Sequence, residues 1–172
     1  MFNIYNSNYF KFTKYFKYMS LSVKILIAVL VCVVLGGLSG FITVNAIQTW
    51  YVTLNKPSWN PPNWLFGPVW TTLYLMMGIA FGLIWHSTNI DKDKAMFLFY
   101  IQFALNMLWS ILFFYFQSPG IALIEIVLML AFILLTTNAF KKIDARAAYL
   151  MIPYIVWVSF ATFLNFTIWK LN

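Results

Sequence analysis

Three apolar segments of this chain carry aromatic and neutral polar side chains at helical spacing, and these residues are the candidates for any chemistry. They are Gln102, Asn106 and Ser110 beside Trp109, then Tyr154, Trp157, Ala161 and Asn165, and finally Trp70, Tyr74 and Phe81. Residues three or four positions apart share one face of a helix, so each set forms a row on its own helix. Rows that combine aromatic rings with a few polar groups are typical of a pocket for a flat, apolar ligand.

Residues that commonly perform acid–base, nucleophilic or metal chemistry are scarce in this sequence. The single cysteine, Cys32, lies in an apolar run and cannot form an intramolecular disulfide or a cysteine-based metal site. Glu125 is the one acid inside an apolar segment, near its start, where it reaches the interface or satisfies a neighbour in a structural role. His86 ends an apolar segment, which leaves open an interfacial position or an axial-ligand role toward a metalloporphyrin. We therefore expect no metal site and no conventional catalytic constellation.

The same aromatic residues have a simpler interpretation as membrane-interface and packing residues. Trp and Tyr are enriched at both bilayer interfaces, and Asn and Gln often hold transmembrane helices together. We assign Trp50, Trp85 and Trp169, which lie at the ends of apolar segments, to such an interfacial belt. Trp157 lies near the middle of its segment, where a belt does not apply, and its row alone does not decide between pocket lining and core packing.

Residues 50–74, with the sequence WYVTLNKPSWNPPNWLFGPVWTTLY, form an unusual connector between two apolar runs. Pro57, Pro61, Pro62 and Pro68 fix their own φ angles and bias each preceding residue toward extended backbone, which stiffens the loop. The Trp residues in it provide large amphipathic surfaces that suit the headgroup region or the mouth of a bundle. We interpret this connector as an aromatic lid over a helical bundle.

Composition and hydropathy place these rows in a membrane. The chain is 63% hydrophobic and only 9% charged, whereas soluble domains average about 25% charged residues. Five segments, residues 23–47, 69–86, 95–116, 121–140 and 147–169, approach or exceed the roughly 20 apolar residues that span a bilayer as a helix. The sequence therefore predicts an all-α membrane protein, a bundle of five transmembrane helices with the aromatic, proline-rich loop between helices 1 and 2. We divide it into a basic N-terminal tail, residues 1–22, and one transmembrane domain, residues 23–172.

The basic residues predict the orientation of this bundle. Eleven Lys and Arg against four acids give a net charge of +7, but the basic residues lie between apolar runs, which indicates membrane topology rather than nucleic-acid binding. Nine of them fall on the side of the N-terminus and two, Lys56 and Lys170, on the opposite side. By the positive-inside rule we expect a cytoplasmic N-terminus in a bacterial cell membrane, with the aromatic loop outside. We expect the tail, which contains no acid, to lie on the membrane surface.

Three stretches of the sequence resemble one known family. They are W-Y-x-x-L-x-K-P-S-W-x-P-P followed by F-G-x-x-W-T-x-L-Y, then LNMLWSILFF at residues 105–114, and PYIVWVSFATFLNFTIWKLN at residues 153–172. In this order and spacing they resemble the TspO/MBR family, the translocator-protein or peripheral benzodiazepine-receptor family, over residues 36–172. The cholesterol-recognition pattern of animal members is altered here because Phe166 and Thr167 occupy its Tyr positions, which argues against sterol binding and favours a bacterial-type member.

The resemblance implies a ligand site inside the bundle. The family's site is lined by residues that correspond here to Trp70, Asn106 and Trp157, and Tyr51 and Pro61 match loop positions that close over the ligand. The implied function is that of a membrane receptor or carrier for tetrapyrroles and similar apolar molecules. Porphyrin or haem is then the ligand and no cofactor is required. The family also suggests homodimers.

Two alternatives stay open beside the receptor or carrier. One is an enzyme that degrades porphyrins with light and oxygen, with Trp70 and Trp157 as oxidisable partners and the ligand's own photochemistry as the driving force. The other is a structural or partner-binding membrane module. The rows and the resemblance together give the predicted ligand-binding residues: Tyr51, Pro61, Trp70, Tyr74, Gln102, Asn106, Trp109, Tyr154, Trp157 and Ala161.

Overall fold

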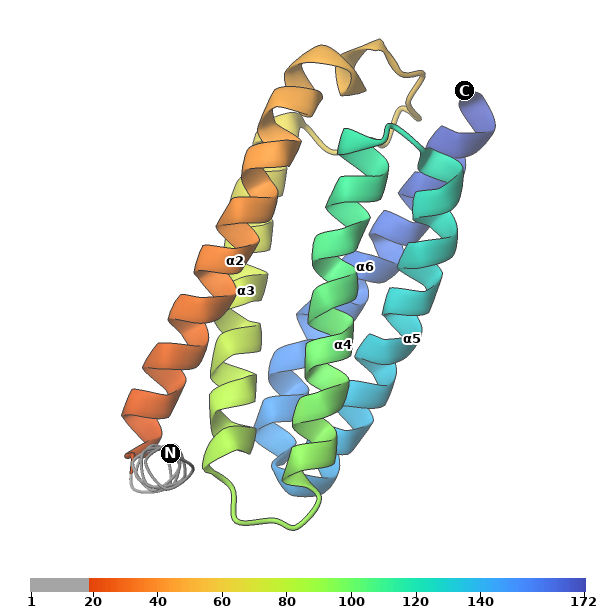
Figure 1. The fold of residues 1–172 in the computed structure, drawn as a ribbon. Helices are drawn as coiled ribbons and strands as arrows, with labels where there is room; N and C mark the ends of the chain where they lie inside the picture. Colours follow the sequence, from red (N-terminus) through yellow and green to blue (C-terminus); the bar gives the residue numbers. More distant parts are fainter. Residues whose placement is uncertain (1–18) are drawn as a thin grey trace, which may run out of the picture.

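Five apolar segments of the chain form long helices that run side by side (Figure 1). The computed structural model describes residues 19–172. With the labels of Figure 1, the helices are α2 (Leu21–Thr49), α3 (Asn63–His86), α4 (Lys92–Ser110), α5 (Pro119–Ile143) and α6 (Ala145–Leu171). Each is long and apolar enough to cross a membrane, α4 together with the π-helical segment Ile111–Tyr115 that continues it. Residues 19–172 contain no strand, so the prediction of an all-α, five-helix bundle is confirmed.

Short connections make successive helices run in opposite directions. Residues 87–91 join α3 to α4, residues 116–118 lead into α5, and Asp144 alone separates α5 from α6. Gln117 adopts a positive φ of 50°, which permits the tight turn before α5. The start of α2 and residues 87–91 therefore lie at one end of the bundle, and residues 50–62 and the C-terminus lie at the other (Figure 1).

Local capping explains where several of these helices begin. Ser20 Oγ accepts a hydrogen bond from the Val23 N–H at 3.4 Å, and Asp144 Oδ1 accepts one from the Arg146 N–H at 2.9 Å. The Arg146 guanidinium also donates to the Asp144 carboxylate at 2.8 Å, which lowers the pKa of this carboxyl. Pro119 stands in the first turn of α5, where a missing N–H leaves no helical hydrogen bond unmade.

Glycine residues bring α2 and α3 into close contact. A Cβ atom on Gly78 would lie 2.5 Å from the Val29 Cα, and one on Gly82 would lie 2.7 Å from the Ile25 Cα. Because only glycine leaves room for the facing backbone, this pair serves packing within one chain. Further along α2, a Cβ on Gly36 would overlap the Tyr74 ring.

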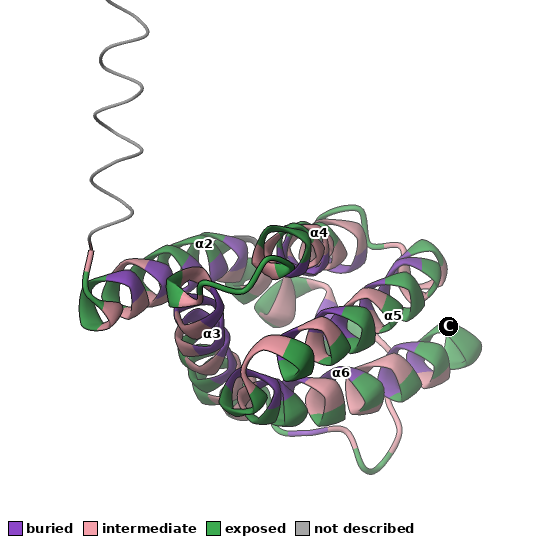
Figure 2. Cartoon of the chain, turned by 90° about the horizontal axis from the view of Figure 1, so that it is seen from below, coloured by how far each residue is buried: buried purple, intermediate pink, exposed green. Residues whose placement is uncertain are grey.

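One aromatic cluster packs in the half of the bundle remote from residues 50–62. The Phe81 and Phe99 ring centroids lie 4.8 Å apart, and Phe99 stacks on Phe140 at 6.0 Å. Buried residues face the interior of the bundle in Figure 2, and exposed ones face outward. The outward residues are largely apolar, such as Ile124 at 75% exposure, as expected for helices surrounded by lipid.

The start of α3 differs most from the sequence-based prediction, and the other helix ends shift by at most three residues when the π-helical segment is counted with α4. Helix α3 begins at Asn63 rather than at residue 69, so Trp64 lies in its first turn and Pro68 lies inside the helix. The missing Pro68 N–H removes one hydrogen bond, which this 24-residue helix tolerates, although proline usually disfavours helix interiors. The loop therefore comprises residues 50–62 and contains three prolines, not four. Helix α5 extends to Ile143 rather than ending at residue 140. Residues 1–18 of the predicted surface tail lie outside the described part of the chain.

Candidate ligand-binding site

A cavity of about 420 Å³ lies in the half of the bundle next to residues 50–62. Its volume falls within the range of about 300–1,000 Å³ that is typical of small-molecule sites. Residues from α2, α3, α6 and the end of α4 line it, together with the start of the loop. Its aromatic lining residues are Tyr51, Trp64, Phe66, Trp70, Tyr74, Trp109, Phe113, Phe114 and Trp157. The arrangement can enclose a flat apolar molecule between aromatic walls.

The cavity brings together six of the ten residues that the sequence predicted as ligand-binding. They are Tyr51, Trp70, Tyr74, Trp109, Trp157 and Ala161. Ser110 and Asn165, which the helical rows also included, line it as well. The predicted rows on the second, third and fifth spans thus meet at one cavity.

Asn106 lies behind the cavity wall rather than on it. Its Oδ1 accepts a hydrogen bond from the Tyr74 hydroxyl at 2.8 Å, and its Nδ2 donates to the Tyr154 hydroxyl at 2.9 Å. All three side chains are buried. Asn106 therefore links α3, α4 and α6 and fixes the position of the Tyr74 ring, which does line the cavity.

The other three predicted residues also lie away from the cavity. Tyr154 is buried beneath it, where its hydroxyl contacts the Met129 Sδ at 3.7 Å. Gln102 lies one turn before Asn106 and is fully buried, with no hydrogen-bond partner for its amide oxygen or nitrogen. Pro61 is buried in the loop. Helical spacing identified the interior faces of these helices, but it does not say which interior residues border an open space.

A second polar group closes the cavity at the end of α4. The Trp109 Nε1 donates to the Asn165 Oδ1 at 3.1 Å, and the Asn165 Nδ2 donates to the Pro119 carbonyl at 2.7 Å. The Trp109 ring also stacks on Phe113 at 5.0 Å. The π-helical segment follows directly, and its Phe113 and Phe114 both face the cavity.

Trp157 is the cavity residue with an unused hydrogen-bond donor. Its Nε1 is buried and has no partner in the described structure. The ring is held by edge and tilted contacts with Phe66 at 6.1 Å and Phe160 at 5.6 Å. An unpaired indole N–H in an apolar wall is costly, so a ligand with an acceptor group gains more there than on an exposed surface.

The loop is tied together around Tyr51. The Tyr51 hydroxyl donates to the Asn60 Oδ1 at 2.6 Å, and the Lys56 ammonium donates to the Tyr51 carbonyl at 2.6 Å while lying 4.9 Å from the centre of the Tyr51 ring. Burial raises the pKa of the Tyr51 hydroxyl to about 12, against the opposing effect of its hydrogen bond to Asn60. Tyr51 is therefore a neutral phenol at physiological pH.

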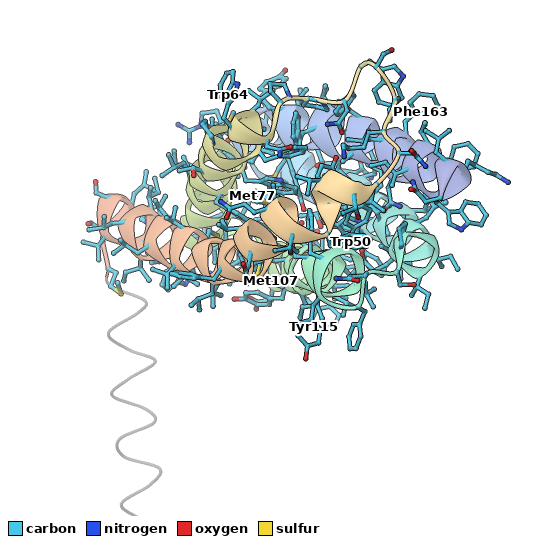
Figure 3. All side chains as sticks on the ribbon, turned by 90° about the horizontal axis from the view of Figure 1, so that it is seen from above. Trp50, Trp64, Met77, Met107, Tyr115 and Phe163 are labelled. Atoms are coloured by element: carbon cyan, nitrogen blue, oxygen red, sulfur yellow. The ribbon has the colours of Figure 1, made fainter. Side chains whose placement is uncertain are left out.

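The same loop is anchored to the end of α6. Asn55 and Asn172 exchange hydrogen bonds of 2.9 and 3.1 Å, and the Trp59 ring stacks on Phe163 at 5.3 Å. Figure 3 shows the loop running from Trp50 across to the side of Phe163 and back to α3 at Trp64. These contacts hold the loop over the α6 side of the bundle.

Comparison with known proteins now decides the family. Residues 28–170 match the TspO/MBR family. The chain belongs to the TspO/MBR family. It is 45% identical over 145 residues to the tryptophan-rich protein TspO of Chlorobaculum tepidum, across 82% of this chain and 90% of that protein. It is 40% identical over 126 residues to the human translocator protein, across 72% of this chain and 75% of that protein.

A bacterial relative carries a different name. The tryptophan-rich sensory protein of Cereibacter sphaeroides is 37% identical over 123 residues, across 72% of this chain and 77% of that protein. Together with the five spanning helices, the family identifies this TspO/MBR protein as a multi-pass integral membrane protein.

Two features of this TspO/MBR protein were not anticipated from sequence. Helix α2 supplies a whole wall of the cavity, whereas the rows predicted from sequence lay on the second, third and fifth spans alone. Glu125, expected to reach the interface or a neighbour, does neither: it is 6% exposed and both carboxylate oxygens lack a hydrogen-bond partner. Among residues 19–172, no three His, Cys, Asp or Glu side chains come together as metal ligands.

Proposed function

We propose that this TspO/MBR protein is a membrane receptor or carrier that binds tetrapyrroles, such as porphyrin or haem, and similar flat apolar molecules in the cavity. The observation that carries the proposal is a cavity of about 420 Å³ with nine aromatic lining residues and an unpaired indole N–H at Trp157. The aromatic walls suit stacking on a macrocycle, and the Trp157 N–H suits an acceptor at its edge.

Few polar groups are available to orient such a ligand. Apart from the aromatic residues, the polar residues that line the cavity are Ser39, Thr43, Asn63, Thr71, Ser110 and Asn165. Three of these side chains already form hydrogen bonds within the protein: Thr43 donates to the Ser39 carbonyl, Thr71 donates to the Gly67 carbonyl, and Asn165 pairs with Trp109 and the Pro119 carbonyl. Recognition therefore depends mainly on shape and apolar contact, with the Trp157 donor as the principal polar addition. Such a site suits a class of flat amphiphiles better than one strongly polar metabolite.

The proposal is tested by titrating protoporphyrin into the protein in lipid nanodiscs and following the Soret absorption band. Ala161 lines the cavity, so Ala161→Phe fills part of it and is expected to weaken binding about tenfold or more. Ala131 is exposed on α5, and Ala131→Phe is the matched control that should bind like the parent. Equal binding by both variants and the parent would refute a ligand site in this cavity.

A porphyrin-degrading enzyme is the second candidate, because Trp70 and Trp157 line the same cavity. Illumination of the porphyrin complex in air separates the two functions. Binding without loss of porphyrin supports a receptor or carrier. Consumption that disappears in Trp70→Phe or Trp157→Phe supports the enzyme. Absence of both binding and consumption supports a structural module.

A further inference from the structure

One side of the cavity is not closed by the bundle. Several lining residues in the halves of α2 and α3 nearest residues 50–62 are exposed at the outer surface, including Val44 at 59% and Trp64 at 72%. Gly37, Gly67 and Thr71 are also exposed while lining the same cavity. A residue that borders both the cavity and the surroundings marks an opening.

Glycines on both helices keep this opening wide. A Cβ atom on Gly37, Gly40 or Gly67 would meet no heavy atom within 4 Å. The α3 glycines farther from the loop have no such space, because a Cβ on Gly78 would lie 2.5 Å from the Val29 backbone. The close packing of α2 on α3 thus ends near Gly36. Between Gly36 and the loop, the space beside these glycines is open.

The loop is fixed away from this opening. Its anchors are the Trp59 ring, which stacks on Phe163 in the last third of α6, and Asn55, which is hydrogen-bonded to Asn172 just after α6. The opening lies between membrane-spanning helices α2 and α3, so its surroundings are lipid tails rather than water. The polar side chain of Thr71, which borders the opening, has its hydrogen bond within the protein, since the Thr71 hydroxyl donates to the Gly67 carbonyl at 2.9 Å.

We propose that the opening between α2 and α3, bordered by Gly37, Gly40, Gly67 and Thr71, is the entrance through which a flat apolar molecule dissolved in the bilayer reaches the cavity. The loop is then a fixed roof and not a gate. This inference rests on the proposed function for the identity of the physiological ligand. The opening itself follows from the exposure of the lining residues and the empty space at the glycines.

A second possible route to the cavity is obstructed by a side chain. A groove of about 690 Å³ lies between α3 and α6, lined by Thr72 and Leu73 on one side and Pro153 and Val156 on the other. Trp157 alone among the described residues borders both this groove and the cavity. Passage there requires the Trp157 ring to leave its contacts with Phe66 and Phe160, whereas the opening between α2 and α3 needs no such movement.

The test uses a cysteine inside the cavity and a reagent dissolved in the bilayer. In a Cys32→Ser background, Ala161→Cys places a thiol on the cavity wall, and N-(1-pyrenyl)maleimide supplied in the lipid adds to it. Adding Gly40→Leu or Gly67→Leu should slow labelling about tenfold, because the new side chain narrows the entrance. Both substitutions enter empty space, so the fold should be preserved. Ala131→Leu on the outer face of α5 is the matched control and should not change the rate.

Three outcomes would overturn this proposal. Unchanged labelling in both glycine variants would exclude the α2–α3 opening. Slower labelling only in Thr72→Leu would assign entrance to the groove beside α6, and faster labelling only in the Pro61→Gly, Pro62→Gly double variant would assign it to the loop. The reagent is not a tetrapyrrole, so failure of the parent protein to bind protoporphyrin would refute the proposed function and leave this result valid.

Ligand kinetics give an independent readout where protoporphyrin binds. An obstructed entrance raises the barrier in both directions, so Gly67→Leu should lower the association and dissociation rates by a similar factor. A residue that only contacts the bound ligand behaves differently, because its loss of contact raises the dissociation rate and leaves association unchanged. Faster dissociation with unchanged association would contradict an entrance at Gly67.

Discussion

Individual residues in this bundle divide into those with a hydrogen-bond partner and those without one. Tyr74, Asn106 and Tyr154 form a closed buried chain, and Trp109 with Asn165 forms another. Buried polar groups in native structures normally have such partners. Trp157 departs from this rule at the cavity wall, which is the residue-scale reason for assigning it to the ligand.

Replacement of Trp157 tests that assignment. Trp157→Phe keeps an aromatic ring and removes the indole N–H, a group worth roughly 1 kcal/mol when hydrogen-bonded. We expect protoporphyrin affinity to fall about fivefold with little change in thermal stability, because no protein acceptor loses a partner. Titration of the Soret band measures the change. Trp169→Phe, at an exposed position at the end of α6, is the control, and a variant that binds like this control would contradict the assignment.

Replacement of Asn106 should act on the fold before it acts on the ligand. Asn106→Leu leaves the Tyr74 and Tyr154 hydroxyls without their partner, and each buried unsatisfied group costs about 1–3 kcal/mol. We expect a lower unfolding temperature in detergent. In the Tyr74→Phe background the further loss should be smaller, because one of the two orphaned hydroxyls is already absent. Full stability with lost ligand binding would instead make Asn106 a direct ligand contact.

The sequence predicted which residues face the interior of the bundle better than it predicted which of them border the cavity. The spacing of Gln102, Asn106 and Ser110 identified an interior face of α4, and all three side chains point inward. Only Ser110 reaches the cavity, because the position of an empty space depends on how far neighbouring helices approach. The distance between helices is set by glycines on α2 and α3. A glycine in α2 forms part of the cavity wall, but it has no side chain that a search for aromatic and polar rows could detect.

At the scale of elements, α2 and α3 act as a pair that is tight at one end and open at the other. Gly78 and Gly82 admit the α2 backbone, while Gly37 and Gly67 face open space. Hydropathy predicted both spans, since a run of apolar residues is sufficient for that purpose. The start of α3 was not predictable in the same way, because Pro68 reads as a loop residue until its neighbours are seen to continue the helix.

Alanine at two glycines separates these two regions. Gly78→Ala places a methyl group 2.5 Å from the Val29 Cα and should destabilise the bundle by about 1–3 kcal/mol through overpacking. Gly37→Ala meets no atom within 4 Å and should be neutral or slightly stabilising, since Ala favours helix over Gly. Thermal unfolding in one detergent compares the two. Equal losses would mean that α2 and α3 remain in contact along their full length.

At the scale of the whole molecule, charge separates the two ends of the bundle. Lys92 and Lys94 open α4, Lys141 and Lys142 close α5, and the structure brings these regions to the end where α2 starts (Figure 1). Lys24 lies in the first turn of α2, with its ammonium 5.6 Å from the centre of the Trp85 ring. Lys56 and Lys170 belong to the opposite end. The asymmetry read from the sequence is therefore an asymmetry of the folded bundle.

This asymmetry predicts that the end with most basic residues faces the cytoplasm. In a Cys32→Ser background, Ser58→Cys in the loop and Thr88→Cys in the α3–α4 connection place exposed thiols at opposite ends. A membrane-impermeant maleimide added to intact cells should label position 58 and leave position 88 protected until the cells are opened. The orientation also locates the proposed entrance, because Gly40 and Gly67 lie toward the loop end of their helices and would then open to the outer leaflet. Labelling of position 88 alone from outside would reverse the bundle, and with it the leaflet from which a dissolved ligand enters.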